Sequence, residues 1–462
     1  MKTRLTLFAL AATLLTGCAH GPMDDGPEVA PPAAWSLAGG DVTPDWAGLL
    51  DPTLAELQDR ALKANRDIAQ ASLRWQQARL LQEQSELRWM PSAGLNLSAS
   101  RPLESEGGSR NIDVGGGVLV PVTTSTGWRR SYGASVGLNY ELDLWDRLAQ
   151  GQAAQRARTE AARTDIDTAR LSIRSQVADA YWSLAALRAL RPLIEAQLAI
   201  TRETLELTRI RVREGKLLPI EVDKIAVTVQ QAENRLADNA ADSLLQRQRL
   251  ALMLAEPLPG PAPDAVLPDA EPPRWRLADP ADVLARRPDV QRARLNVDAA
   301  LATLRVREAE RYPQLSFSGS LGGGGAHVRD WLANPAISLG ANLAIPLIDW
   351  QRLALQRDGA RSDLELAALA LRDTLHKAQA DIESQHIETQ RLAQQLAANA
   401  SRLREATETE RLAALRYEVG AVARADWLQL RSAQLDAQQA RIQLRLRQWQ
   451  VQAQLFKALG GA

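Results

Sequence analysis

The sequence predicts a mixed fold in which membrane-length β-strands alternate with very long α-helices, and this pattern occurs twice. The first observation is a strict alternation of apolar and polar residues over Ser131–Leu144, typical of a strand with one apolar and one polar face. The second is that this strand leads into Arg147–Gly215, an Ala-, Leu- and Arg-rich stretch that indicates a single helix. The third is a repeat of the pair, with a strand at Ile337–Leu347 and a helix at Gln351–Tyr417.

Composition limits the classes of function. The chain has 462 residues, of which 45% are hydrophobic, so it can bury large apolar surfaces. Lys and Arg number 55, as do Asp and Glu, and the formal net charge is zero. Nucleic acid is therefore not an expected partner, because binding to phosphates needs a basic surface. The single cysteine, Cys18, rules out a disulfide within the chain.

The N-terminus has the features of a secretion signal. Lys2 and Arg4 precede a short apolar run, Leu5–Leu15. The sequence Leu15-Thr16-Gly17-Cys18 follows and resembles a bacterial lipobox, which implies cleavage before the cysteine and a covalent lipid on it. The alternative is an ordinary signal peptide with a chance cysteine. The shortness of the apolar run and the small Thr-Gly pair favour the lipoprotein.

The lipobox fixes the expected start of the mature chain. Residues 1–17 are interpreted as a lipoprotein signal peptide and residues 18–50 as an acylated, extended tether, since this stretch is rich in Pro and Gly and has no periodicity. Ala19 stands where retention in the inner membrane would typically use Asp, so we expect the outer membrane of a bacterial cell.

The remaining elements of the first half, residues 51–280, follow from periodicity and from helix breakers. In order, we expect a helix over Asp51–Met90 ended by Pro91, a strand over Ala93–Ser100, a long polar loop over Arg101–Arg130, the strand and helix named above, a return helix over Ile220–Ala255, and an irregular Pro-rich link over Glu256–Pro280.

The second half, residues 281–462, repeats this order. We expect a helix over 281–312, a strand over Leu315–Leu321, the second strand and long helix named above, and a return helix over 424–459. Matching residues occur at a constant separation, for example Gly215 with Gly420 and Glu221 with Asp426. The chain is therefore an internal duplication.

The number of strands has a consequence for assembly. The pattern gives two strands in each half, whereas the smallest closed transmembrane barrels need about eight. Open sheet edges are not tolerated in lipid, because their backbone groups would lack hydrogen-bond partners. The chain must therefore oligomerise to close its sheet.

Short motifs along nearly the whole mature chain carry a family resemblance. They are the lipobox, Asp51-Pro52-x-Leu54 with Ala61-Leu62-x-x-Asn65, Arg287-Pro288-Asp289-Val290, Tyr312-Pro313, Leu142-Asp143-Leu144-Trp145, Ile345-Pro346-Leu347, Arg416-Tyr417-x-x-Gly420 and Asp426-Trp427-Leu428. Through these motifs taken together, the chain resembles the outer membrane factor (TolC-like) family of tripartite efflux systems, in its acylated, OprM/NodT-like lipoprotein branch.

The resemblance implies architecture, partners and function. It implies a homotrimer with a twelve-stranded transmembrane β-barrel, four strands per chain, that continues into a long periplasmic α-helical barrel. It further implies a passive outer membrane channel for small molecules such as drugs, served by a periplasmic adaptor and an inner-membrane pump of the resistance-nodulation-division type, with outer membrane lipids around it. No cofactor is expected beyond the lipid on Cys18.

The resemblance also suggests a periplasmic gate. In the family an acidic residue early in the last helix forms a ring in the lumen, and Asp426 occupies that position, with Glu221 as its partner in the repeat. We expect Arg416, Tyr417 or Arg424 to supply contacts that offset repulsion between like charges. The simpler interpretation is that each carboxylate favours the positive end of a helix dipole, and both roles can hold together.

The two helix-hairpin tips are the expected docking points for the adaptor. Arg211 and Gly215 mark the first tip, and Arg416 and Gly420 the second. The first tip departs from the second, because Val212 stands in place of Tyr417 and Pro219 precedes the return helix.

Tryptophans stand near the strand ends. Trp128 and Trp331 lie near the expected outer ends, and Trp145 and Trp350 near the periplasmic ends. They fit a membrane-interface girdle. Packing between helices and strands is an equal alternative for Trp145 and Trp350.

Nothing in the sequence predicts an enzyme. Gly133-Ala134-Ser135-Val136-Gly137 matches a hydrolase pattern, yet the strand continues past the serine instead of turning into a helix. The histidines lack metal-ligand spacing, so no metal site is expected. Two alternatives remain for function: the outer membrane duct of a type I protein secretion system, which shares the fold, and a periplasmic adaptor or scaffolding lipoprotein, which needs no membrane-length strands.

Overall fold

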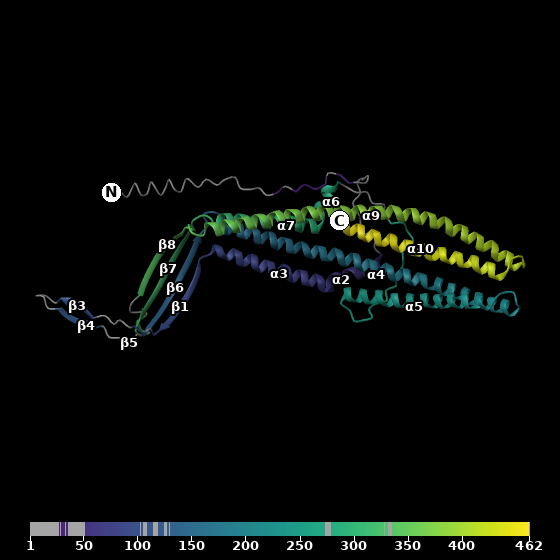
Figure 1. Cartoon of the computed structure of the whole chain (residues 1–462), viewed down its shortest axis with the longest axis horizontal. Helices are drawn as coiled ribbons and strands as arrows, with labels where there is room; N and C mark the ends of the chain where they lie inside the picture. The colour runs from purple at the N-terminus through teal and green to yellow at the C-terminus, as the bar shows by residue number, and fades with distance from the viewer. Residues whose placement is uncertain are drawn as a thin grey trace.

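The computed structural model places one sheet at the end of a long helical bundle (Figure 1). It describes residues 27, 29–32, 34–35, 51–101, 103–104, 109–113, 119–123, 127–128, 130–272, 279–327, 329–330 and 335–461. Within these residues no helix is both long enough and apolar enough to span a bilayer.

The main sheet has four antiparallel strands in the order β1-β6-β7-β8. They are β1 (Ser92–Ser100), β6 (Ser131–Leu142), β7 (Gln314–Gly325) and β8 (Pro335–Ala344). The central pair β6–β7 joins the two halves of the sequence, and β1 and β8 are the two edges.

The register of the sheet puts the apolar residues on one face. Leu95 lies opposite Val136, which lies opposite Leu321, which lies opposite Ile337. These four side chains are between 47% and 75% exposed. The alternation predicted from the sequence is therefore confirmed, and the single chain leaves the apolar face uncovered. β6 and β8 end at Leu142 and Ala344, slightly before the predicted Leu144 and Leu347.

The long helices and their return helices agree closely with the sequence prediction. They are α4 (Arg147–Arg213), α5 (Ile220–Leu254), α9 (Trp350–Glu418) and α10 (Arg424–Ala458). Two shorter helices stand in line beside each long one, α3 and α5 beside α4, and α7 and α10 beside α9 (Figure 1).

Two predicted helices are each divided into two. The helix expected over Asp51–Met90 is α2 (Pro52–Ala64) and α3 (Arg66–Glu86), followed by the 3₁₀ turn η2 (Leu87–Trp89). Asn65 makes the break: its backbone is extended, and its side chain accepts from the amides of Asp67 and Ile68. Short polar side chains favour such local bonds over helix continuation.

The helix expected over 281–312 breaks in the corresponding place. It consists of α6 (Pro280–Arg286) and α7 (Pro288–Ala309), with Arg287 extended between them. Pro288 accounts for the break, since the residue before a proline is disfavoured in the helical conformation.

The expected loop over Arg101–Arg130 is also wrong in part. β2 (Leu103–Glu104) pairs with β5 (Gly127–Trp128), and β3 (Ser109–Asp113) pairs with β4 (Leu119–Thr123). The Gly- and Ser-rich composition of the whole stretch concealed short runs such as Leu119-Val120, whose residue types favour strands.

The core lies where α2, α4 and α10 meet. Tyr181 and Trp182 on α4 are 1% and 0% exposed, and the Trp182 ring lies 5.3 Å from that of Trp449 on α10. The Tyr181 hydroxyl donates a 2.6 Å hydrogen bond to Asp51, which also caps α2. Val29 and Trp35, from the segment expected to be a tether, pack against this core.

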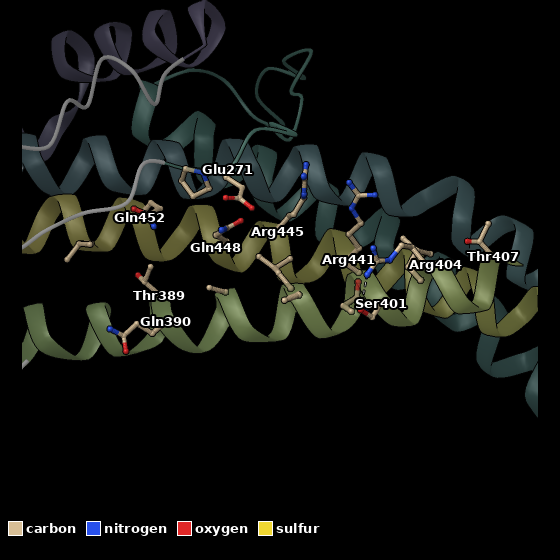
Figure 2. Close-up of a pocket in the computed structure, with 18 of the residues that line it drawn as sticks. Glu271, Thr389, Gln390, Ser401, Arg404, Thr407, Arg441, Arg445, Gln448 and Gln452 are labelled. Atoms are coloured by element: carbon tan, nitrogen blue, oxygen red, sulfur yellow. Dashed lines mark hydrogen bonds between the residues drawn. The ribbon is translucent and has the colours of Figure 1, made fainter. Parts of the chain in front are cut away.

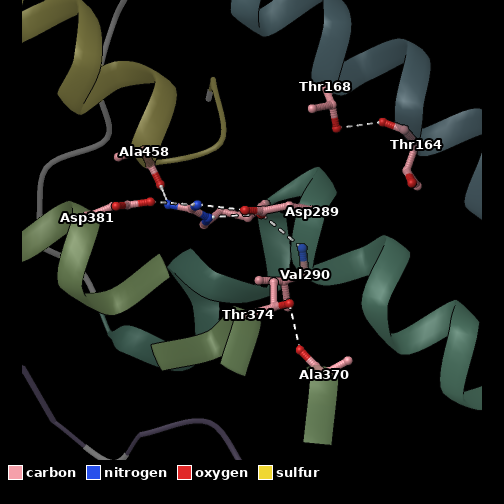
Figure 3. Close-up of polar contacts among 9 residues, drawn as sticks. Thr164, Thr168, Asp289, Val290, Ala370, Thr374, Asp381 and Ala458 are labelled. Atoms are coloured by element: carbon pink, nitrogen blue, oxygen red, sulfur yellow. Dashed lines mark hydrogen bonds and ion pairs between the residues drawn. The ribbon is translucent and has the colours of Figure 1, made fainter. Parts of the chain in front are cut away.

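Arg287 joins three elements next to this core, and its partners Asp289, Asp381 and Ala458 are labelled in Figure 3. The residue is 7% exposed, and its guanidinium binds both carboxylate oxygens of Asp289, at 3.0 and 2.7 Å. It also donates to the Ala458 carbonyl at 2.8 Å and lies 3.5 Å from Asp381. The start of α7, the middle of α9 and the end of α10 are thereby joined.

The Pro-rich link is irregular over its described residues, as predicted, and is held to the bundle by arginines. Arg60 pairs with Glu256, Arg188 on α4 with Asp264, and Arg445 on α10 with Asp269.

Candidate functional site

The two hairpin tips lie together at the end of the bundle opposite the sheet (Figure 1). Gly215 and Gly420 have φ of +70° and +77°, a conformation that side chains disfavour. The amide after each glycine bonds back at 2.8 Å, to the carbonyl of Arg211 in the first tip and of Arg416 in the second. Both tips thus use the same Schellman-type turn, and both arginines are exposed.

Next to its tip, the second hairpin carries a cluster of two aromatic rings and a cation, Tyr417, Trp427 and Arg424, called the aromatic–cation cluster below. The rings of Tyr417 and Trp427 stack with centroids 5.4 Å apart and planes 6° apart. The guanidinium carbon of Arg424 lies 5.0 Å from the Tyr417 ring centroid and 4.4 Å from that of Trp427. These distances fall within the range of cation–π attraction.

Arg424 also reaches out of its own hairpin. Its Nε donates to Glu203 on α4 at 2.6 Å, with both side chains about one-third exposed at 34% and 38%. The hydrogen bond and negative charge of Glu203 raise the pKa of Arg424. This ion pair therefore holds the α9–α10 hairpin to α4.

Trp427 has a second partner behind the stack. Its Nε1–H donates to Glu410 on α9 at 3.0 Å, and the Arg431 guanidinium lies 3.7 Å from the same carboxylate. The Glu410 side chain is only 13% exposed. Below the cluster, Leu428 and Leu435 of α10 pack with Ile200 of α4 in a separate small core.

The two candidate gate carboxylates lie in equivalent places. Glu221 is in the first turn of α5 and Asp426 in the first turn of α10. Glu221 accepts a 2.7 Å hydrogen bond from Lys224 and is half-buried, whereas Asp426 is exposed. Both positions favour a negative charge through the helix dipole.

The first hairpin has no counterpart of the cluster. At the separation that relates Gly215 to Gly420, Tyr417, Arg424 and Trp427 correspond to Val212, Pro219 and Val222. The duplication thus extends to the turns and the carboxylates, while the cluster belongs to the second hairpin only.

The tryptophans predicted at the membrane interface differ in their contacts. Trp145 stacks on Tyr312 at 4.9 Å and donates to the Pro313 carbonyl at 2.7 Å, which favours helix–strand packing as its role. Trp350 begins α9, is 54% exposed and lies 4.2 Å from the Arg311 guanidinium. The backbone of Trp128 is in β5. Trp331 and Cys18 lie outside the described residues.

A groove of about 1170 Å³ runs between α9, α10 and the Pro-rich link (Figure 2). Most of its lining residues are polar or charged; of its arginines, Arg441 and Arg445 pair with Asp269 of the link, and Arg404 donates to Ser401. Among the described residues no group of His, Cys, Asp and Glu side chains could hold a metal ion.

Sequence reasoning identified Tyr417, Arg424 and Asp426 but missed three residues that contact one another or Arg424 in the same region, Trp427, Glu203 and Glu410. Trp427 stood within a motif carrying the resemblance, so its position was a usable signal. Glu203 and Glu410 are ordinary members of Glu- and Arg-rich helices, and only the packing of α4 and α9 against α10 reveals them.

Comparison with known proteins extends over both halves of the chain. The sequence model described as "Outer membrane efflux protein" matches residues 57–256 and 280–461. The pyoverdine export outer membrane protein OpmQ of Pseudomonas aeruginosa is 30% identical, over 98% of this chain and 96% of its own. Nodulation protein T of Rhizobium leguminosarum bv. trifolii is 26% identical, over 96% of this chain and 94% of its own.

A solved structure has the same fold. The MtrE outer membrane channel of Neisseria gonorrhoeae, solved in its open state, superposes with a TM-score of 0.79 at 22% identity. The match covers 96% of this chain and 98% of that one. The long helices and the four-stranded sheet are therefore common to both folds.

Proposed function

The chain belongs to the outer membrane efflux protein family, and from this premise we propose how it works as the outer membrane channel of a tripartite efflux system. It is a passive duct: the pump drives transport, and the channel opens or closes the path to the exterior. The observation that carries the proposal is an ion pair near the tips of the two helix hairpins, in which Arg424 of the second hairpin binds Glu203 of the first. An ion pair between the two hairpins at this end can control the width of a helical duct.

The duct is formed by three copies. Support comes from the edges β1 and β8, which have no further strand beside them among the described residues, and from the apolar face that they share. Edge-to-edge pairing of copies would satisfy the open backbone groups, as a bilayer requires. Native mass spectrometry in detergent tests this stoichiometry, and a stable monomer would contradict it.

The gate combines a charged ring with a latch. Around a threefold axis, Asp426 and Glu221 form rings of negative charge that attract cations. The latch is the pair Arg424–Glu203 with Tyr417 stacked beneath it, and it offsets the repulsion within the rings. Breaking the latch opens the duct.

The remaining assignments concern partners and anchoring. The exposed tips at Arg211–Gly215 and Arg416–Gly420 dock a periplasmic adaptor, which links the channel to a resistance-nodulation-division pump. Cys18 carries the lipid that anchors the chain in the outer membrane. The cargo is small molecules, as the name of the pyoverdine-exporting relative suggests.

The test is complementation in a strain that lacks its own channel. The gene is expressed with its neighbouring adaptor and pump, and the intracellular accumulation of a fluorescent amphiphilic dye is measured. Lower accumulation than in the empty-vector strain is expected. Unchanged accumulation together with a newly secreted polypeptide would instead indicate a type I secretion duct.

A further inference from the structure

A continuous line of contacts runs from α9 through α10 to α4 at the cluster. It begins at Glu410, passes through the Trp427 indole, continues through the Arg424 guanidinium and ends at Glu203. Every step is short: 3.0 Å from Nε1 to Oε1, 4.4 Å from cation to ring centroid, and 2.6 Å from Nε to Oε1. We propose that Trp427, held in place by Glu410, is the positioning residue that keeps Arg424 on Glu203. This inference rests on the proposed latch.

The environment of Glu410 explains why the indole is held firmly. A carboxylate that is 13% exposed has lost most of its water and depends on its remaining donors. Those donors are Nε1–H of Trp427 and, at a longer distance, Arg431. If the indole rotated away, Glu410 would lose the Trp427 hydrogen bond and keep only the more distant Arg431 of these two donors. The hydrogen bond from Trp427 to Glu410 therefore fixes the plane of the indole ring.

A fixed ring in turn limits Arg424. A free arginine samples many rotamers, and forming a single ion pair costs the entropy of that choice. The Arg424 guanidinium lies close to both Trp427 and Tyr417, whose planes are nearly parallel. The stack therefore selects the rotamers from which Nε reaches α4, and the partly exposed pair with Glu203 becomes stronger than an isolated surface pair.

The internal repeat provides a comparison within the same chain. The positions that correspond to Glu410, Arg424 and Trp427 in the first hairpin are Leu205, Pro219 and Val222. None of these can donate or accept with its side chain. The positioning device is consequently confined to the α9–α10 hairpin, which makes that hairpin the element whose release opens the duct.

The test compares variants by single-channel recording in a planar bilayer, with native mass spectrometry to confirm assembly. Trp427→Ala and Glu410→Ala should each raise the open fraction by roughly two- to five-fold, the effect of one cation–π contact. Trp427→Phe retains a ring but no donor and should fall between Trp427→Ala and wild type. Glu408→Gln is the matched control, because this carboxylate is exposed on the same helix and pairs with Arg411.

A double variant separates positioning from general weakening. Because Trp427 acts through Arg424, adding Trp427→Ala to Arg424→Ser should leave the open fraction of Arg424→Ser unchanged. An additive rise would overturn the inference. A closed Trp427→Ala channel beside an open Arg424→Ser channel would also overturn it and leave the latch standing, whereas a closed Arg424→Ser channel would refute the latch itself.

Discussion

Replacing Arg287 by methionine is expected to destabilise the protein far more than an ordinary arginine substitution. The guanidinium is 7% exposed and holds Asp289, Asp381 and the Ala458 carbonyl. Removing one partner of a buried pair typically costs about 3–5 kcal/mol, because the other charge is left without compensation. Here the side chains of Asp289 and Asp381 are 42% and 62% exposed, so water partly replaces the arginine.

These exposures set the expected magnitude near the lower limit. We expect a loss of about 3 kcal/mol, of which about 1 kcal/mol comes from the unsatisfied carbonyl of Ala458. In a chain of this size such a loss lowers the apparent Tm by roughly 3 °C. The assay is thermal unfolding followed by circular dichroism in detergent at a fixed scan rate. Arg307→Met is the control, since Arg307 lies near the other end of α7 and pairs with Glu310, but its side chain is 41% exposed.

The reasoning also makes a prediction about acid. Burial alone would raise the pKa of Asp289, but the hydrogen bond and charge of Arg287, with the Val290 amide, lower it below its ordinary 3.8. A carboxyl with a lowered folded-state pKa stabilises the fold above its ordinary value, and that stabilisation is lost as the pH falls through the folded-state value. Wild type should therefore lose Tm below about pH 4 more steeply than Arg287→Met. Two results would refute this account: an equal dependence of Tm on pH in wild type and Arg287→Met, or a loss of Tm in Arg287→Met no larger than that in Arg307→Met.

Three further predictions concern the channel itself. Cys18→Ser should abolish acylation, measured by mass spectrometry, yet leave an assembled oligomer, because the strands anchor it independently; dissociation would give the lipid a structural role. Asp426→Ala should lower the cation preference in single-channel recordings, since a ring of negative charge is removed; unchanged selectivity would leave Asp426 as a helix-capping residue. Arg416→Glu should weaken cross-linking to the adaptor and reduce efflux, because the exposed tip would present the opposite charge; intact cross-linking and efflux would argue against this contact.

The parts of the fold governed by strict periodicity were predictable. The alternation of β6 and the length of α4 follow from local pattern, because one apolar face must be buried or meet lipid. The breaks at Asn65 and Arg287 were missed because each interrupts a helical pattern through local backbone bonding or a following proline. The short strands within Arg101–Arg130 were missed because the composition of the stretch outweighed single residues.

The residues of the candidate site likewise fall into those that the sequence marks and those that only the packing of helices reveals. Gly215, Gly420 and Tyr417 were found because the repeat and the resemblance mark their positions, and Arg424 because a positive charge was expected close to Asp426. Glu203 lies far from Arg424 in sequence and belongs to a helix with many similar charges. Choosing it among them requires the packing of α10 on α4, which no local pattern encodes.

The open edges of the sheet bear on how the protein is made. Over its described residues, a lone copy presents two unpaired strand edges beside an exposed apolar face, which is a template for unwanted association. The helical bundle has its own core around Tyr181 and Trp182 and can become ordered before the strands find partners. During biogenesis, pairing of strand edges between copies then competes with aggregation. The yield of assembled protein depends on how many nascent copies arrive at the membrane together.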